Sequence, residues 1–348
     1  MEARTIDVAL QGGGAHGAFT WGVLHRLLDE PDIAITGVSG TSAGAMNGVA
    51  LVQGLAEGSP ARAQDLMAVF WDRVAKAAAF SPVQRTPIDR MLQGWRLDRS
   101  PLYEWADAMG QFFSPYYANP LDINPLRQIL RETFDFELIN KKGAPKFFQS
   151  ATNVRTGRLK LFRQPKITIE TTLASACLPT VYQAVEIDGE AFWDGGYMGN
   201  PPLFPLIDET PTLDTILVQI NPFIRETLPR SRNDIENRLN EIIFNGSLIN
   251  ELRSLGFLHQ LIESEDLDRD AYRNGRLHRI ANEDEMQSLN LSTKMNASPD
   301  FLDYLFNVGV KSAETWLSDH GDAVGKKSTW IPRYVVEESR SPAHLADG

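Results

Sequence analysis

A serine in a glycine-rich pentapeptide is the residue of this sequence best placed to do chemistry. Residues 40–44 form GTSAG, in which Ser42 follows the apolar run 33–38 and precedes an apolar helical pattern over 43–55. A G-x-S-x-G pentapeptide between a strand and a helix is the setting of a nucleophile elbow, whose sharp turn needs small flanking residues. Those small residues are Gly40, Ala43 and Gly44. We expect Ser42 to be a nucleophile, and the alternative is an ordinary glycine-rich turn.

A serine hydroxyl is a weak nucleophile, so the sequence must also supply a base. Asp194 is the best candidate, because it follows the strand-like EAFW and precedes Gly195 and Gly196. The two glycines let another backbone approach the carboxylate closely. A carboxylate that touches a serine can take its proton directly if the site is dry enough to raise its basicity. The alternative is a structural aspartate in a turn.

Histidine is the more familiar base for a serine, and it leaves a second possibility open. In a Ser–Asp–His order the histidines that qualify are His259, His278 and His320. None of them lies in a glycine-rich loop after a clear strand, so a serine esterase with a triad is the weaker hypothesis. Changing each histidine to alanine would separate a triad from a Ser42–Asp194 pair.

Three consecutive glycines, Gly12 to Gly14, stand between a strand-like run over 6–10 and a helical pattern over 21–28. They could form a phosphate cradle, an oxyanion hole or a tight turn. With Gly17 they complete G-x-G-x-x-G, the dinucleotide fingerprint, which would make the chain a non-catalytic nucleotide-binding module. The acid of that fingerprint would be Asp32, which precedes its strand instead of ending it. That hypothesis also leaves GTSAG and Asp194 unexplained.

Four segments together resemble the patatin-like phospholipase family: QGGGAHGAFTWGVL, GTSAG, ASACLPTVYQAVEIDG and DGGYMGNPP, in family order within about residues 5–202. The resemblance implies a Ser42–Asp194 dyad, an acyl-enzyme intermediate and a lipid or other acyl ester as substrate. It implies no metal or cofactor, and the sequence holds no EF-hand loop, HExxH or CxxC. Beyond residue 202 no family motif is matched.

The same resemblance assigns the glycine loop to an oxyanion hole. The donors would be the backbone amides of Gly12, Gly13 and Gly14, and the Ala43 amide beside the nucleophile is a further candidate. The family often carries Arg where this chain has His16. Because the charge of a histidine depends on its surroundings, His16 has either a direct role or a packing role in the loop.

The elements around these residues alternate between strand and helix. We expect strands over 6–10, 33–38, 146–154, 158–162, 215–220 and 277–280, and helices over 21–28, 43–55, 61–79, 125–134, 169–176, 233–262 and 299–318. A hairpin is expected at Asp188–Gly189. The alternation predicts a three-layer α/β/α fold with a mainly parallel central sheet. We expect one domain over 1–335, an aromatic cap or lid over 80–124, and a polar tail over 336–348.

Composition limits the classes of partner. The 348 residues carry a net charge of −11, which argues against nucleic acid as a partner. Residues 33–56 are uncharged but too rich in glycine and hydroxyl residues for a membrane span. No signal peptide is evident, so we expect a cytoplasmic protein with transient membrane-surface contact, although export by another route stays open. The oligomeric state is undetermined. The single cysteine, Cys177, is expected to be a buried small apolar residue.

Overall fold

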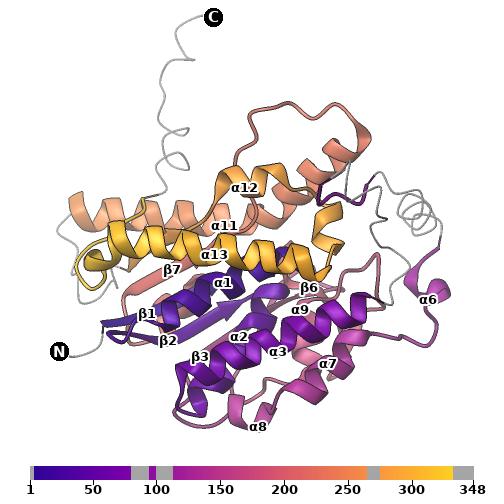
Figure 1. The fold of residues 1–348 in the computed structure, drawn as a ribbon, viewed down its shortest axis with the longest axis horizontal. Helices are drawn as coiled ribbons and strands as arrows, with labels where there is room; N and C mark the ends of the chain where they lie inside the picture. The colour runs from indigo at the N-terminus through magenta and orange to yellow at the C-terminus, as the bar shows by residue number, and fades with distance from the viewer. Residues whose placement is uncertain (1–3, 80–93, 99–112, 265–274, 332–348) are drawn as a thin grey trace, which may run out of the picture.

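The computed structural model describes residues 4–79, 94–98, 113–264 and 275–331, and Figure 1 shows their arrangement. The strands are β1 (Arg4–Leu10), β2 (Ile33–Gly40), β3 (Lys146–Asn153), β4 (Leu159–Arg163), β5 (Val185–Ile187), β6 (Glu190–Asp194), β7 (Asp214–Val218) and β8 (Arg276–Ile280). The helices are α1 (Gly17–Leu28), α2 (Ala43–Ala56), α3 (Pro60–Ala78), α6 (Pro115–Ala118), α7 (Pro125–Thr133), α8 (Phe136–Ile139), α9 (Ile169–Ser175), α10 (Phe204–Glu209), α11 (Arg232–Ser264), α12 (Glu283–Ser288) and α13 (Pro299–His320).

The strands form one sheet in the order β5-β6-β3-β2-β1-β7-β8, and β4 pairs with β3 outside this path. The pairs β1–β2, β1–β7, β2–β3 and β7–β8 are parallel. The pairs β3–β4, β3–β6 and β5–β6 are antiparallel. The prediction of a mainly parallel central sheet between helices is confirmed, with an antiparallel section at the β3 side.

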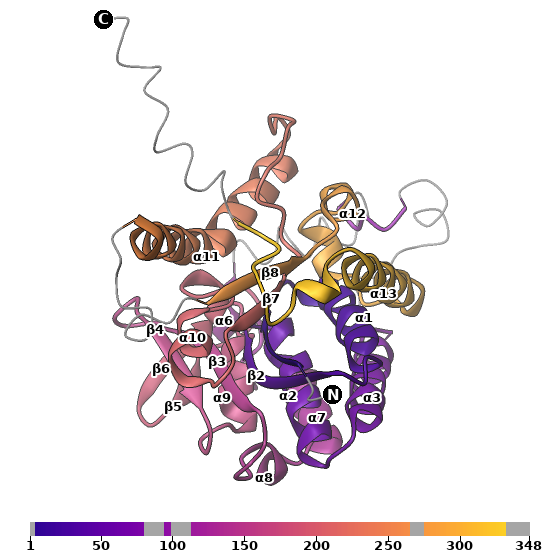
Figure 2. The same ribbon diagram turned by 90° about the vertical axis from the view of Figure 1, so that its left-hand side faces the viewer.

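Alternating side chains send each strand's apolar groups to both faces of the sheet. On β1, Val8 and Leu10 join the larger core cluster, whereas Ala9 joins a smaller one. On β7, Ile216 and Leu217 divide in the same way. Figure 2 shows α1, α2, α3 and α13 on one side of the sheet and α11 on the other. Strands buried on both faces explain why the sequence shows continuous apolar runs there instead of a polar alternation.

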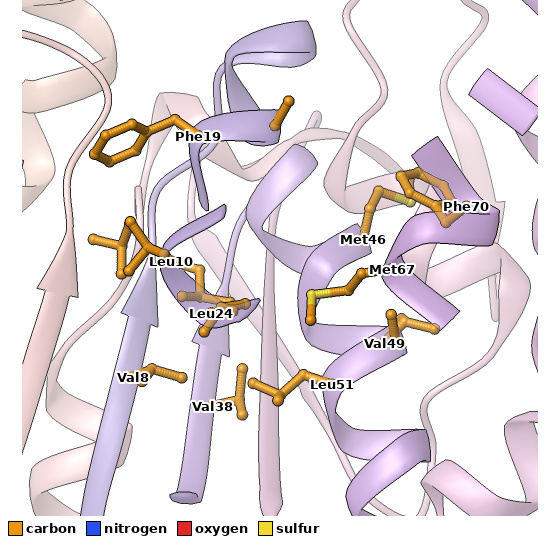
Figure 3. Packing of buried hydrophobic residues seen from close by; sticks show 14 of the residues in the cluster. Val8, Leu10, Phe19, Leu24, Val38, Met46, Val49, Leu51, Met67 and Phe70 are labelled. Atoms are coloured by element: carbon orange, nitrogen blue, oxygen red, sulfur yellow. The ribbon is translucent and has the colours of Figure 1, made fainter. Parts of the chain in front are cut away.

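The larger core fills the space between β1, β2 and the first three helices (Figure 3). Leu10 and Val38 from the sheet lie close to Leu24 of α1 and Leu51 of α2. Further members of this cluster are Val8, Phe19, Met46, Val49, Met67 and Phe70. This packing holds the carboxyl ends of β1 and β2, and the loops that follow them, in a fixed relation.

The expected elements are found with ends that differ by at most four residues, and the hairpin turns at Asp188 and Gly189, where φ is 53° and 79°. The short helices α8, α10 and α12 had no clear signal in the sequence. Of the expected lid, 80–93 and 99–112 lie outside the described residues, as does the tail over 336–348. The single domain, the lid and the tail stay predictions. Within the described residues, no helix combines the length and apolar character needed to cross a bilayer.

Candidate active site

Ser42 stands at a strained turn between β2 and α2. Its backbone has φ 53° and ψ −122°, a conformation with positive φ that residues other than glycine rarely adopt. Thr41 secures the turn, because its hydroxyl lies 2.6 Å from Ser150 Oγ and donates to Gly199 O at 2.7 Å. The Ser42 N–H donates to Ser175 Oγ at 3.0 Å. Ser42 is 8% exposed and lines a cavity, so its hydroxyl is held at a surface that a ligand can reach.

The residues around Ser42 must be small because the backbones of β1, β2 and α2 approach one another closely there. A Cβ on Gly40 would lie 2.7 Å from Gly44 O, and a Cβ on Gly44 would overlap Leu10 O on β1. Real Cβ atoms do not come this close to a carbonyl oxygen, so either substitution would push α2 away from the sheet. The elbow therefore depends on the two glycines for its packing against β1.

Strand β3 brings the carboxyl ends of β2 and β6 together. Gly40 at the end of β2 pairs with Gln149, and Asp194 at the end of β6 pairs with Ala151. Because β4 pairs along the other edge of β3, strands β2 and β6 share one edge. The first is parallel to β3 and the second is antiparallel, so their carboxyl ends point toward each other. This arrangement places Asp194 beside the turn that carries Ser42.

The Asp194 carboxylate is fully buried and only partly hydrogen-bonded. Its Oδ1 accepts from the Gly196 N–H at 2.7 Å, whereas its Oδ2 has no hydrogen-bond partner within the described residues. Burial raises the pKa of Asp194 to about 7, and the Gly196 N–H, the Ser42 hydroxyl and the Lys294 ammonium oppose that rise. A carboxylate with a pKa near neutrality can both accept and return a proton at physiological pH.

Two glycines follow this carboxylate where the chain turns back. A Cβ on Gly195 would overlap Ser150 on β3, and a Cβ on Gly196 would overlap the Phe244 ring on α11. Asp194 itself caps this turn through the Gly196 N–H. The glycines therefore let β3 and α11 close around the carboxylate and exclude water from it.

The glycine loop after β1 borders the same cavity. Gly13, Gly14 and Ala43 line it, and the described residues offer no recorded acceptor to their backbone amides. Gly12 differs, because its N–H donates to Asn200 Oδ1 at 2.7 Å in a buried position. The expectation that Gly12 supplies an oxyanion donor is therefore wrong, since a side-chain acceptor already occupies its amide.

Gly14 and His16 fasten the loop to the 3₁₀ turn Ser292–Met295. Gly14 has φ 59°, and a Cβ there would lie 2.5 Å from Lys294 O. His16 Nε2 lies 2.7 Å from Thr293 Oγ1. The Thr293 hydroxyl donates its proton to Asn290 O, so His16 Nε2 is the donor of this contact. The loop is thus held against this turn by backbone fit and by one buried hydrogen bond.

His16 differs in charge from an arginine at this position. Burial lowers the pKa of His16 well below its ordinary value, and the nearby Lys294 and Arg225 lower it further. The side chain is therefore a neutral imidazole, packed edge-on against the Phe301 ring, and it is not among the cavity-lining residues. This environment gives it a hydrogen-bonding and packing role.

The cavity beside Ser42 has a volume of about 300 Å³. Apart from Ser42, Asp194, Asn240 and Lys294, its wall is mostly apolar. The larger apolar side chains in it are Met46, Phe70, Trp71, Val74, Leu126, Leu178, Val181, Phe244, Leu291 and Met295. A space of this size and lining suits an acyl chain that ends in an ester at the serine.

Four further residues of the site escaped the sequence analysis. Ser175 and Asn200 lie within two of the quoted segments, but nothing in their own sequence context marked them. Asn221 Nδ2 donates to Gly12 O at 2.8 Å, and Lys294 lines the cavity. These last two lie beyond residue 202, where no motif was matched, so only the folded chain could reveal them.

The distal histidines do not approach Ser42. His278 Nε2 donates to Asp214 Oδ1 at 3.0 Å, and its Nδ1 lies 2.9 Å from Thr329 Oγ1. Asp214 begins β7, so it lies at the amino-terminal ends of the parallel strands, whereas Ser42 follows the carboxyl end of β2. None of His259, His278 and His320 lines the cavity. The pairing of Asp214 with His278 is therefore structural, and the triad hypothesis has no geometric support here.

The features of a dinucleotide or metal site are also missing from the described part of the chain. Asp32 precedes β2, far along the strand from the glycine loop, and its carboxylate pairs with Arg4 at 2.5 Å. Across the same described ranges, no three His, Cys, Asp or Glu side chains gather where they could hold a metal ion. We therefore assign no ligand set for a cofactor to these residues.

Comparisons with known proteins agree with the motifs. The model of the patatin-like phospholipase family matches residues 8–207. The structure of VipD from Legionella pneumophila is 17% identical, with a TM-score of 0.41, covering 92% of this chain and 67% of that one. The ExoU–SpcU complex from the type III secretion system of Pseudomonas aeruginosa gives 16% identity, a TM-score of 0.30, and coverage of 98% and 67%. No curated protein sequence matches.

Proposed function

Because the chain belongs to the patatin-like phospholipase family, we propose that it is a lipid acyl hydrolase that uses Ser42 and Asp194 as a catalytic dyad. One observation carries the proposal. Asp194 is fully buried, it lines the same cavity as Ser42, and its Oδ2 has no hydrogen-bond partner within the described residues. An unpaired buried carboxylate oxygen is unfavourable for folding, and its position next to a strained serine is what a general base requires.

In the first half-reaction Ser42 Oγ attacks the carbonyl carbon of the ester as Asp194 Oδ2 takes the hydroxyl proton. The carbonyl π electrons move to the oxygen, which becomes the oxyanion of a tetrahedral intermediate. The amides of Gly13, Gly14 and Ala43 stabilise that charge in our proposal, because they border the cavity and have no other acceptor in the part of the chain that the structure describes. Collapse re-forms the carbonyl, breaks the bond to the leaving alcohol, and returns the proton from Asp194 to that alcohol.

In the second half-reaction a water molecule replaces the alcohol. Asp194 takes one proton from it, and the resulting hydroxide attacks the acyl carbon of the Ser42 ester. Collapse of the second tetrahedral intermediate breaks the bond to Ser42 Oγ, which receives the proton from Asp194. The products are a carboxylic acid and the free enzyme, in which Asp194 is again an ionised carboxylate.

The apolar cavity supports an acyl chain as the part of the substrate that is bound. Met295 lines the cavity and is also 50% exposed, so an apolar surface continues from the cavity to the outside of the molecule. We include transient contact with a lipid surface in the proposal, because a lipid substrate has to leave its aggregate to reach Ser42. The head group and the position of the cleaved ester are not specified by these residues.

The test is hydrolysis of p-nitrophenyl esters with short and long acyl chains, with fatty-acid release from phospholipid vesicles measured alongside. Ser42→Ala and Asp194→Asn should each abolish turnover, whereas His278→Asn, which changes a residue outside the cavity, should keep it. A fluorophosphonate probe should label wild type and fail to label Ser42→Ala. Hydrolysis that survives in Asp194→Asn would place the base elsewhere, and a wild type that cleaves no ester would refute the function.

A further inference from the structure

Lys294 is a partly buried cation in the wall of the proposed active site, and neither the motifs nor the family match accounts for it, because it lies outside residues 8–207. Its Nζ donates to Asn221 Oδ1 at 2.8 Å and to Asn240 Oδ1 at 2.7 Å, and it lies 5.4 Å from the centre of the Phe244 ring. Within the described residues no carboxylate comes within ion-pair distance of it. Amide oxygens are neutral and do not cancel the charge of the ammonium, so that charge acts on the other ionisable groups of the site.

The charges around Lys294 leave the site with an excess of positive charge. Glu241 is buried nearby, but it is already engaged by Arg225 at 2.6 Å and Arg238 at 3.2 Å. Asp194 is the other acid whose charge acts on Lys294. With Asp194 ionised, these five groups sum to one positive charge in a chain whose net charge is −11. The excess favours one further negative charge in the cavity.

Lys294 also reaches the glycine loop through one intermediate. Asn221 Oδ1, which accepts from Lys294, lies 3.8 Å from the position that a Cβ would occupy on Gly13. The other end of the same amide donates to Gly12 O at 2.8 Å. The ammonium therefore fixes which way the Asn221 amide faces, and the amide fixes the backbone of the loop next to the elbow.

We propose that Lys294 is a positioning residue of this active site: its ammonium holds the glycine loop through Asn221 and keeps the Asp194 carboxylate in its charged, proton-accepting form. Lys294 supplies the positive charge at this loop because His16, which stands where the family often has Arg, is neutral. The inference rests on the proposed function, since it assigns work to Lys294 only if Asp194 is the base.

Removing the ammonium should therefore change how the reaction depends on pH. The charged groups that face Lys294 are Asp194, Glu241 and Arg225, and burial is the largest influence on the ammonium itself. Burial lowers the pKa of Lys294 to about 8, and the pKa of Asp194 is about 7. In wild type, kcat/KM should rise through about pH 7 as Asp194 loses its proton, and fall through about pH 8 as the ammonium of Lys294 loses its proton.

The experiment compares pH profiles of kcat/KM for wild type, Lys294→Met, Lys294→Arg and the control Lys311→Met, which removes an exposed lysine of α13. In Lys294→Met the acid limb should move up by about one pH unit, because an opposite charge no longer favours ionised Asp194. In Lys294→Arg the acid limb should stay and the alkaline limb should disappear, since a guanidinium stays charged. Lys311→Met should reproduce the wild-type profile.

An unchanged acid limb in Lys294→Met would overturn the proposal while leaving the hydrolase assignment intact. If circular dichroism shows that Lys294→Met does not fold, the arginine variant decides, and a wild-type alkaline limb in it would overturn the proposal. If the proposed function is wrong, wild type shows neither ester hydrolysis nor fluorophosphonate labelling at Ser42. The proposed role of Lys294 is then refuted as well. The two failures are therefore distinct.

Discussion

Replacing Asp194 with asparagine should make the protein more stable at the pH where the enzyme works, while it abolishes hydrolysis. The reason lies in burial, which raises the pKa of the carboxyl to about 7 in the folded protein from its ordinary value of 3.8. The folded state then holds a proton that the unfolded chain has released. Stability therefore falls as pH rises from the unfolded pKa to the folded one, and the full loss persists above it.

The magnitude follows from the size of the shift. A rise of about three pKa units corresponds to roughly 4 kcal/mol by which the ionised Asp194 destabilises the fold. Asparagine carries no charge and can still accept from the Gly196 N–H. Other contacts of the asparagine amide contribute to the free energy of unfolding by an amount that does not vary with pH. The pH dependence of the stability difference therefore reports the charge of Asp194 alone. The stability advantage of Asp194→Asn should grow by about 2 to 3 kcal/mol between about pH 5 and pH 8.

Urea unfolding followed by circular dichroism at a series of pH values measures this difference. Ser42→Ala is the matched control, because it removes the nucleophile and keeps the buried carboxylate. It should lose hydrolysis yet retain the wild-type dependence of stability on pH. A stability difference between Asp194→Asn and wild type that stays constant with pH would refute the reasoning, since it would mean that ionisation of Asp194 does not destabilise the folded protein.

Other predictions concern the glycine loop and the histidines. Gly14→Ala and Gly157→Ala both place alanine at a positive φ, 59° and 65°, which should lower the free energy of unfolding by about 1 to 2 kcal/mol in each. Only Gly14 also meets a carbonyl at 2.5 Å, so only Gly14→Ala should lose further stability and kcat/KM; equal effects would contradict the packing. His278→Asn should keep turnover but lower the unfolding free energy by about 1 to 3 kcal/mol, because buried Asp214 loses a partner; lost turnover would revive the triad. His16→Gln should keep the acid limb near pH 7, because the imidazole is already neutral, and a displaced limb would show that it carries charge.

Local patterns were sufficient for most of the fold. Strands such as 33–38 are apolar and β-branched, helices such as 43–55 follow with the right period, and Asp188–Gly189 marks a hairpin. These signals act between near neighbours in the chain, so they can be recognised without tertiary structure. The short helices were missed, because a helix of four to six residues has too few turns to show a period.

The sequence also marked the two residues of the proposed dyad. Ser42 was marked by small residues that a strained turn demands, and Asp194 by the two glycines that follow it. Each signal is local, because steric limits on a turn are met by its own residues. The assignment of Gly12 as a donor failed for the opposite reason, since its amide is taken by Asn200, a partner 188 residues away along the chain.

Only the tertiary structure decided how these pieces combine. The carboxyl ends of β2 and β6 meet because both strands pair with one edge of β3 in opposite directions, which no local pattern encodes. The basicity of Asp194 likewise arises from burial by β3 and α11, and Lys294 enters the site from a turn 100 residues further along the chain. Strand register, desolvation and long-range charge depend on which distant segments share space, and that is settled only when the whole chain is packed.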